Sequence, residues 1–207
     1  MPSGVTLELG SLPTIHPNMA FLSCYGASAI IRLCLDPTTM PSDTMVRSVI
    51  VEWVARPGGS ASQELTREIS WKKDVPKSMA DEAFKWAFTK SSHVITEEAA
   101  VCVMALLLHD LENVECLKVL EPGSGGDYLV VIPGVPPLQA ESSGIRVDPK
   151  GYLSTQRMNE KCEQVLKKSS AGFASVTAFS HSPSQDVRCQ LRYVAKSDGA
   201  EGKSGQE

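Results

Sequence analysis

The spacing of apolar residues in the second half of the chain predicts helices and strands in a fixed order. A helical spacing of Ala, Val and Leu residues comes first, and short apolar runs bounded by turn residues follow it. The expected elements are a helix at 97–111, strands at 116–120, 128–132 and 138–144, a helix at 154–168 and a last strand at 173–179. This half of the chain is therefore predicted to fold in the order α-β-β-β-α-β.

The connection at 133–137 is short and rich in proline and glycine. It is short enough for a hairpin and too short for a crossover, so the runs 128–132 and 138–143 should be adjacent antiparallel strands. The helices on either side of this pair in the sequence are expected to flank the sheet.

The helix at 154–168 has an apolar stripe with helical spacing, made by Met158, Cys162 and Val165. This stripe should face the sheet. Two basic residues beside it, Arg157 and Lys161, are placed to lean over the end of the sheet, while Gln164 and Lys168 are expected elsewhere on the surface.

The first half of the chain reads as strand-rich, with strands expected at 6–9, 28–35, 47–55 and 65–71. The run at 28–35 also has the Ala and Leu content of a helix. We prefer a strand there, because Asp36 and Pro37 end the run abruptly and a clear strand follows. A capping pattern at Ser78 predicts a helix at 79–90, and Thr96 is expected to cap the next helix.

No linker separates the two halves of the chain. We expect residues 1–92 to form a strand-rich region packed on a core of residues 93–195. Residues 196–207 are polar and rich in Gly and Ser, which predicts a disordered tail. The expected fold class is α/β (α+β), with a mixed sheet.

The amino-acid composition is that of an ordinary globular protein and argues against some kinds of binding site. The chain has 207 residues, of which 42% are hydrophobic and 21% charged, as in ordinary globular proteins. Its net charge of −4 gives no overall attraction to a phosphate backbone, which leaves only a local basic patch for nucleic acid. The six cysteines are scattered singly, as expected for reduced thiols rather than a zinc site or a disulfide framework.

The sequence has neither a signal peptide nor a membrane-spanning segment that we can detect. The first residues lack the positive start and apolar stretch of a signal peptide. The apolar runs fall far short of the roughly 20 residues that a membrane span requires. We therefore expect a soluble, cytoplasmic protein without a membrane partner, whose oligomeric state is left open.

Two acids stand at the facing ends of the predicted hairpin strands. Asp127 precedes the run at 128–132, and Glu141 lies within the run at 138–144. Two carboxylates at one end of a sheet suit Mg²⁺, a hard cation that usually takes one or two protein carboxylates and keeps several waters. The alternative is that Asp127 merely begins a strand after a glycine turn and Glu141 is solvated.

The element order and the two acids resemble the core of the PD-(D/E)XK nuclease superfamily. The segments at 123–128, 141–145 and 160–165 look more narrowly like uncharacterised bacterial proteins related to that superfamily. The resemblance covers the second half of the chain. It implies a restriction-endonuclease-like core, a magnesium-dependent hydrolase acting on DNA or RNA, and a metal held by Asp127 and Glu141, with Glu97 or Glu98 as the helix acid. We take Glu98 as the possible third ligand.

The chain departs from the family at the lysine that orients or activates the attacking water, because Ser143 stands there. A serine hydroxyl cannot offset charge developing on a phosphate. Arg157, Lys161 or Lys118 would have to supply the cation. The candidate catalytic residues are therefore Asp127, Glu141, Ser143 and Lys161.

Two functions remain open from the sequence. The first is a metal-dependent phosphodiesterase acting on nucleic acid, with or without a protein partner. The second is a non-catalytic binding or assembly protein that keeps a degenerate nuclease-like fold, since a fold does not carry its function with it.

Overall fold

The computed structural model describes residues 5–19, 22–34, 45–57, 62–71, 85, 89–120, 127–147, 155–180 and 186–196. These residues form one mixed eight-stranded sheet with the strand order β1-β3-β2-β8-β7-β6-β5-β4. The strands are β1 (Val5–Glu8), β2 (Met45–Val54), β3 (Gln63–Trp71), β4 (Cys116–Val119), β5 (Tyr128–Val131), β6 (Leu138–Val147), β7 (Ala171–Ser180) and β8 (Val187–Ala195).

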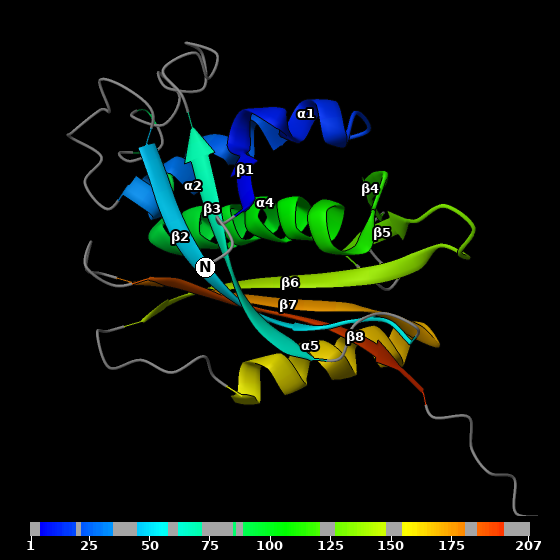
Figure 1. The fold of residues 1–207 in the computed structure, drawn as a ribbon. Helices are drawn as coiled ribbons and strands as arrows, with labels where there is room; N and C mark the ends of the chain where they lie inside the picture. Colours follow the sequence, from blue (N-terminus) through cyan, green and yellow to red (C-terminus); the bar gives the residue numbers. More distant parts are fainter. Residues whose placement is uncertain are drawn as a thin grey trace, which may run out of the picture.

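Helices cover both faces of this sheet (Figure 1). They are the short α1 (Leu12–Ile15), α2 (Leu22–Cys34), α4 (Ser92–Glu112) and α5 (Thr155–Lys168), with a 3-10 turn η1 (Leu9–Ser11) before α1. The helix α4 lies on one face with α1 and α2 outside it, and α5 lies on the opposite face. The chain thus has an α/β fold with a mixed sheet.

The second half of the chain has the predicted element order. Strands β4, β5 and β6 form an antiparallel meander, and α5 connects β6 to its parallel neighbour β7. Tyr128 pairs with Ala140 and Val130 with Leu138, so the predicted hairpin is confirmed. The helices before and after this meander lie on opposite faces of the sheet, as Figure 1 shows.

The strands of the first half join the same sheet. β2 pairs in parallel with β8, and β3 and β1 extend the sheet outward from β2. The strand β8 was not predicted, although it connects the two halves of the chain. Strands on both sides of the expected boundary at residue 92 therefore belong to one sheet.

The predicted strand at 28–35 is wrong, because its described part, 28–34, lies in the helix α2. Gly26, Ala27, Ser28 and Ala29 are all buried, and α2 packs closely along α4. Small side chains allow that close approach between two helices. A short apolar run has the same appearance in a buried helix and in a buried strand, so its pattern alone did not separate them.

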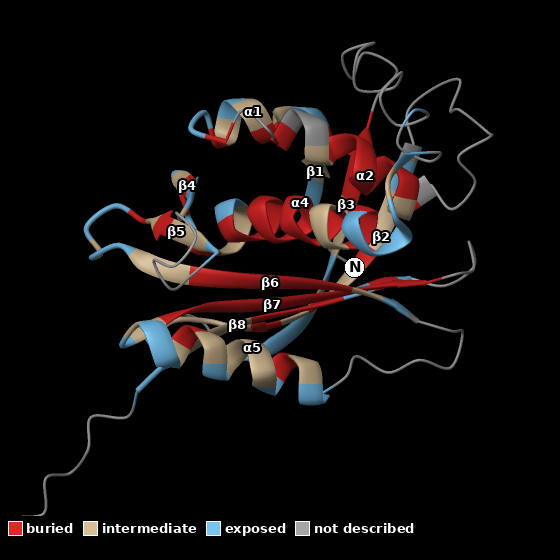
Figure 2. Ribbon diagram, turned by 180° about the vertical axis from the view of Figure 1, so that it is seen from behind, coloured by how far each residue is buried: buried red, intermediate tan, exposed pale blue. Residues whose placement is uncertain are grey.

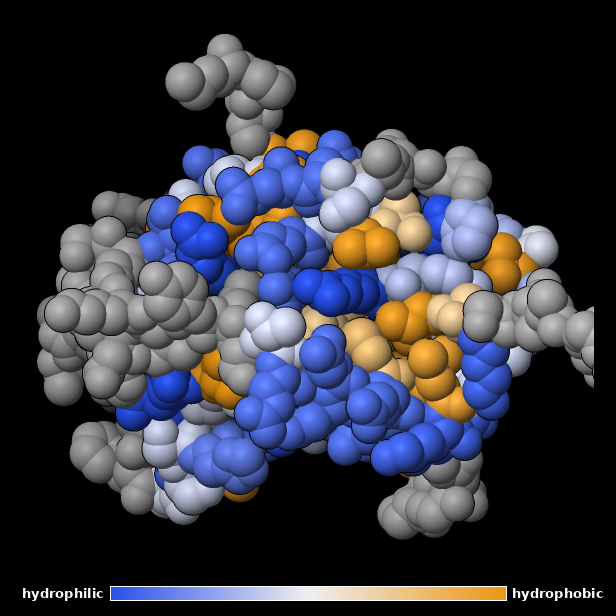
Figure 3. Space-filling view, turned by 90° about the horizontal axis from the view of Figure 1, so that it is seen from below, coloured by the Kyte–Doolittle hydropathy of each residue, from blue (hydrophilic) through white to orange (hydrophobic). Residues whose placement is uncertain are grey.

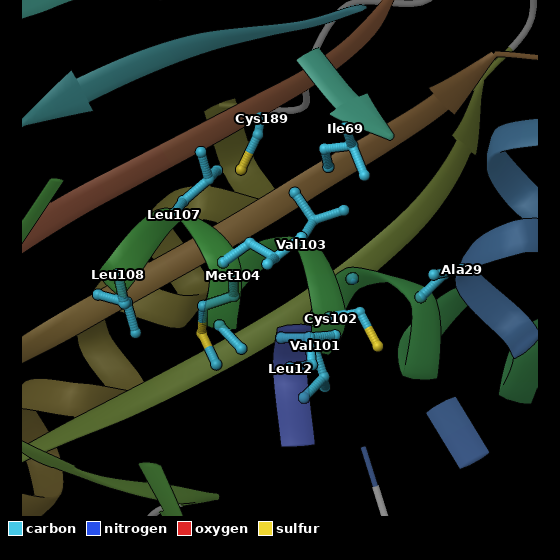
Figure 4. Close-up of a cluster of buried hydrophobic side chains, with 14 of the residues drawn as sticks. Leu12, Ala29, Ile69, Val101, Cys102, Val103, Met104, Leu107, Leu108 and Cys189 are labelled. Carbon is cyan, nitrogen blue, oxygen red and sulfur yellow. The ribbon is translucent and has the colours of Figure 1, made fainter. Parts of the chain in front are cut away.

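The helix α4 is the centre of the core. Its residues from Ala99 to Leu108 are all buried, and Figure 2 shows burial along most of its length. In the close-up, Val103 and Leu107 lie near Ile69 and Cys189 of the sheet, and Cys102 lies on the side of Ala29 (Figure 4). A helix that is apolar around its circumference must be covered on all sides, as this one is.

The helix α4 begins earlier than predicted. Ser91 is its N-cap and accepts a hydrogen bond from the backbone N–H of Val94, so the expected cap at Thr96 is wrong. Thr96 is buried inside the helix and donates to the carbonyl of Ser92. The helix ends at Asn113, whose left-handed backbone, at φ 55°, closes the last turn.

The helix α5 packs through the predicted stripe. Met158 and Val165 are fully buried against Ala174, Val176 and Ala178 of the sheet, with Cys162 partly buried beside them. Polar and charged residues predominate on the outside of this face, with apolar residues in smaller groups between them (Figure 3).

Two predicted segments lie outside the described residues. They are the helix at 79–90, apart from a few of its positions, and the tail, of which only Lys196 is described. Among the helices that are described, none is long and apolar enough to cross a membrane.

Gly144 on β6 marks the closest approach between the sheet and α4. A Cβ atom there would collide with the carbonyl oxygen of Thr96 and lie 2.7 Å from its carbonyl carbon. Both atoms belong to helix backbone, which cannot move aside without shifting α4.

We predict that Gly144→Ala lowers the free energy of unfolding by on the order of 3 kcal/mol, because it forces α4 away from β6. Gly134→Ala is the matched control, because Gly134 has φ +72° and no atom within 4 Å of its added Cβ. Only backbone strain of about 1 kcal/mol applies there. Urea unfolding measures both values, and equal losses would contradict the close packing of β6 on α4.

Candidate functional site

The β5–β6 hairpin brings Asp127 and Glu141 together. Because Tyr128 pairs with Ala140, Asp127 stands just before β5 and next to Glu141. In its protonated form the Asp127 carboxyl donates a hydrogen bond to the Glu141 carboxylate. Asp127 lies on the exposed side of this contact and Glu141 on the buried side.

Glu141 is held by two lysines of α5. Its side chain is only 2% exposed, and Lys161 Nζ lies 3.2 Å from Oε2 while Lys168 Nζ lies 3.1 Å from Oε1. The reach of Lys161 matches the prediction. Lys168 is exposed, as predicted, but its ammonium group turns back to the buried carboxylate, a contact that was not predicted.

The spacing of Lys161 and Lys168 in the sequence indicates that both side chains can reach the same carboxylate. Residues seven apart on a helix lie on one face, two turns from each other. Lys161 and Lys168 therefore project from the same side of α5, and the four-carbon stem of each is long enough to carry its charge to a carboxylate between them.

The pKa of Asp127 is raised and the pKa of Glu141 is lowered. Partial burial, followed by the hydrogen bond to Glu141 and the charge of Glu141, raises the pKa of Asp127 to about 6. Burial alone would also raise the pKa of Glu141. The hydrogen bond from Asp127 and the two lysines outweigh it, so the pKa of Glu141 is lowered.

Ser143 belongs to a second group of polar contacts on the same strand. Its buried hydroxyl accepts a hydrogen bond from Arg157 Nε at 3.0 Å and lies 3.3 Å from Glu97 Oε1, to which it donates. The other oxygen of Glu97 accepts from the backbone N–H of Gly144 at 2.9 Å. Glu97 is therefore the acid of α4 that reaches β6.

Glu98 is not brought to the Asp127–Glu141 pair. It faces α2, where it accepts hydrogen bonds from Ser28 and from Lys90 Nζ at 2.7 Å. Within the described ranges, no group of three or more His, Cys, Asp or Glu side chains is arranged to hold a metal ion. Lys118, on β4, is exposed.

No known protein identifies the chain. No protein-family model, no curated protein and no solved structure matches it. The contacts of the site itself therefore have to support any functional inference.

Asp127 and Glu141 have the chemistry of a two-carboxylate site for one hard divalent cation. Mg²⁺ commonly takes one or two carboxylates and keeps several waters, so a third acid is not needed. Partial burial is the largest cause of the raised pKa of Asp127, and the hydrogen bond to Glu141 and the charge of Glu141 raise it further. A cation at this carboxylate pair would have to compete with Lys161 and Lys168, which already pair with both oxygens of Glu141.

The two acids should respond differently to amide substitution. The pKa of Asp127 is higher in the folded protein, at about 6, than in the unfolded chain. Protonated Asp127 therefore stabilises the fold fully at pH values below the unfolded pKa, and this stabilisation is lost as the pH rises through about 6. In metal-free buffer at pH 8, Asp127→Asn should therefore raise Tm, because it removes the repulsion. At pH 4 the two proteins should differ little.

Glu141→Gln should instead lower the free energy of unfolding at pH 8 by on the order of 3 kcal/mol, because it leaves two lysines without their carboxylate. In the wild-type protein the pKa of Glu141 is lower than in the unfolded chain. Ionised Glu141 therefore stabilises the fold at pH values above the unfolded pKa, and this stabilisation is lost as the pH falls. Thermal unfolding across pH 4–8 measures both variants. A destabilised Asp127→Asn protein at pH 8 would contradict the assigned repulsion.

Proposed function

We propose that the protein is a metal-dependent phosphodiesterase that acts on nucleic acid. The observation that carries this proposal is that Lys161 Nζ lies 3.2 Å from Oε2 of Glu141, on the carboxylate that Asp127 also contacts. Two acids and a lysine that lie close together are the groups that the resemblance to PD-(D/E)XK nucleases requires. Here α5 supplies the lysine that is absent at Ser143.

The element order supports the same proposal. The path from α4 through β4, β5 and β6 to α5 and β7 is the order expected for a restriction-endonuclease-like core. Asp127 stands at the start of the second strand of this path, and Glu141 lies on the third strand. These are the positions that the two acids of that core would take.

Each side chain has a role in this proposal. Asp127 and Glu141 would hold Mg²⁺, which when bound lowers the pKa of a coordinated water and offsets charge on the phosphate. Lys161 orients Glu141 and keeps a positive charge beside the carboxylates. Arg157 donates to Ser143 and is ion-paired with Glu160 at 3.2 Å and with Glu97 at 3.9 Å, so it holds Ser143 in place. Preorganised charges of this kind stabilise charge that develops on a phosphate.

A second function, non-catalytic binding or assembly, also has an observation in its favour. Both oxygens of Glu141 are already paired with lysines, and its side chain is 2% exposed. A carboxylate neutralised in this way needs no metal ion. In this alternative the site is an ion pair that stabilises α5 on the sheet, and the fold serves as a scaffold.

A measurement of metal binding distinguishes the phosphodiesterase from the scaffold. A ligand that binds only the folded state raises its stability, and about 100-fold saturation contributes about 2.7 kcal/mol. For a chain of this size we predict that excess Mg²⁺ or Mn²⁺ raises Tm by about 5 °C. Asp127→Asn should abolish this rise. An equal rise in the variant would place the metal elsewhere.

Cleavage of a labelled oligonucleotide in Mg²⁺ tests the activity. We predict that Lys161→Met lowers kcat by about 100-fold, because it removes the charge that substitutes for the family lysine. Lys161→Arg should restore part of the activity, because it keeps the positive charge.

Lys167→Met is the matched control. Lys167 is the neighbouring lysine of α5, is 73% exposed and lies 3.9 Å from Glu163. It should leave kcat unchanged. Equal activity of the Lys161→Met and Lys167→Met proteins, with both folded by circular dichroism, would remove Lys161 from the proposal.

A further inference from the structure

A buried histidine joins the N-terminal segment, defined here as residues 9–19, to α4. His16 follows the last residue of α1 and is fully buried. Its ring reaches α4, where Nε2 lies 3.2 Å from the carbonyl oxygen of Ala105. A carbonyl oxygen can only accept a hydrogen bond, so Nε2 carries the proton of the neutral ring and donates to Ala105. The apolar side chains of the segment that are fully buried are Leu9, Leu12 and Met19.

The second ring nitrogen of His16 has no hydrogen-bond partner among the described residues. This nitrogen, Nδ1, is itself buried. In the neutral ring it holds a lone pair and carries no charge. A proton on Nδ1 would instead bury a positive charge together with an N–H group that meets no acceptor, and both are unfavourable in an apolar contact. The docked segment therefore favours the neutral form of His16.

No carboxylate is placed to stabilise a protonated His16 from the described elements that pack on α1. The 3-10 turn η1 and the helix α2 contain no Asp or Glu. The charged residue of α2, Arg32, donates to Ser92, which lies roughly 20 Å along α4 from Ala105. The acids of α4 have partners elsewhere, with Glu97 at Gly144, Glu98 at Lys90, Asp110 at Arg67 and Glu112 at Arg56.

The titratable group that faces His16 from α4 is His109, one turn after Ala105. The two rings meet edge to face, with their centroids 6.2 Å apart. His109 is exposed, and its Nδ1 donates to the carbonyl oxygen of Val114 at 3.0 Å. Burial is the largest cause that lowers the pKa of His16 from its ordinary value of 6.5. The hydrogen bond to Ala105 opposes this change, and the positive charge of His109 lowers the pKa further.

The strand β4 also contacts the segment. Its Cys116 sulfur accepts a hydrogen bond from Asn18 at 3.1 Å. This contact supplies a thiol, not a carboxylate, next to the segment. In acid, His16 thus gains repulsion from His109 without a counter-charge from the described residues.

We propose that the contact of His16 with Ala105 is an acid-sensitive switch that holds the N-terminal segment on α4 at neutral pH and releases it near pH 5. Release would expose the apolar side chains of the segment and the side of α4 that they cover. The inference goes beyond the proposed phosphodiesterase function and does not depend on it, because the switch shares no residue with the Asp127–Glu141 site.

The direction of the pH dependence follows from the two states of the segment. In the released segment His16 lies in water, where its pKa is about 6.5, and in the docked segment its pKa is lower. Docking is therefore fully stable above about pH 6.5 and is weakened as the pH falls, because the released form binds the proton. With a docked ring that stays neutral, the ratio of released to docked segment rises about 30-fold between pH 7.5 and pH 5.

Hydrogen exchange of the backbone amides measures this release. After correction for the intrinsic effect of pH on exchange, protection of residues 9–19 should fall about 30-fold between pH 7.5 and pH 5. Protection of the central strand β7 should change much less. His16→Phe keeps a ring in the contact and removes the titration, so it should abolish the fall. His16→Gln keeps a donor for Ala105 and gives the same comparison where the larger ring does not fold.

His93→Gln is the matched control, because His93 is an exposed histidine of the same helix. It should show the wild-type fall. His109→Gln should keep most of the fall, because burial is the larger cause of the lowered pKa of His16.

Four results would overturn the switch. They are a wild-type segment that keeps its protection at pH 5, an equal fall in the His16 variants, a fall that His109→Gln abolishes, and an equal loss of protection in β7. The last result would show that the whole fold opens in acid and not the segment alone.

Discussion

The fold depends on α4, a helix that is apolar around its whole circumference and must be kept from water on all sides. The sheet covers one side, and α1 and α2 cover the other. This burial requires the close contact between Gly144 and the backbone at Thr96. It also fixes where the polar ends of α4 lie, because Ser92 and Glu97 are carried to the edge of β6 by the same packing.

The site follows from a second constraint, which is the burial of the Glu141 carboxylate. An isolated carboxylate in this position would cost several kcal/mol of desolvation, and two lysines of α5 offset that cost. Asp127 lies at the exposed side of the same group, and partial burial, the hydrogen bond to Glu141 and the charge of Glu141 raise its pKa. The pairing of both Glu141 oxygens with lysines favours the scaffold function. The proximity of two carboxylates, which are ligands that Mg²⁺ takes, favours the proposed catalytic function.

Elements of the fold that depend on the local spacing of apolar residues or on the length of a connection could be predicted from the sequence. The β5–β6 hairpin followed from its short connection, and the buried face of α5 followed from Met158 and Val165. Asp127 and Glu141 were found because the hairpin register places them together. The errors arose where tertiary contacts decide. The run in α2 becomes a helix by packing on α4, and β8, which was not predicted, is held between β2 and β7. Lys168 is on the surface as predicted, but its contact with Glu141 was missed, because a long side chain can turn back from an exposed position.

A crystal structure of the protein soaked with Mn²⁺ distinguishes the phosphodiesterase from the scaffold, because the ion is located by its anomalous scattering. We predict an anomalous peak at the Asp127 and Glu141 carboxylates, about 2.1–2.2 Å from an oxygen of each, with Lys168 moved off Glu141 and Lys161 still beside it. An unchanged Glu141 that keeps both lysines, with no peak at this pair, would contradict the metal site and leave the scaffold function.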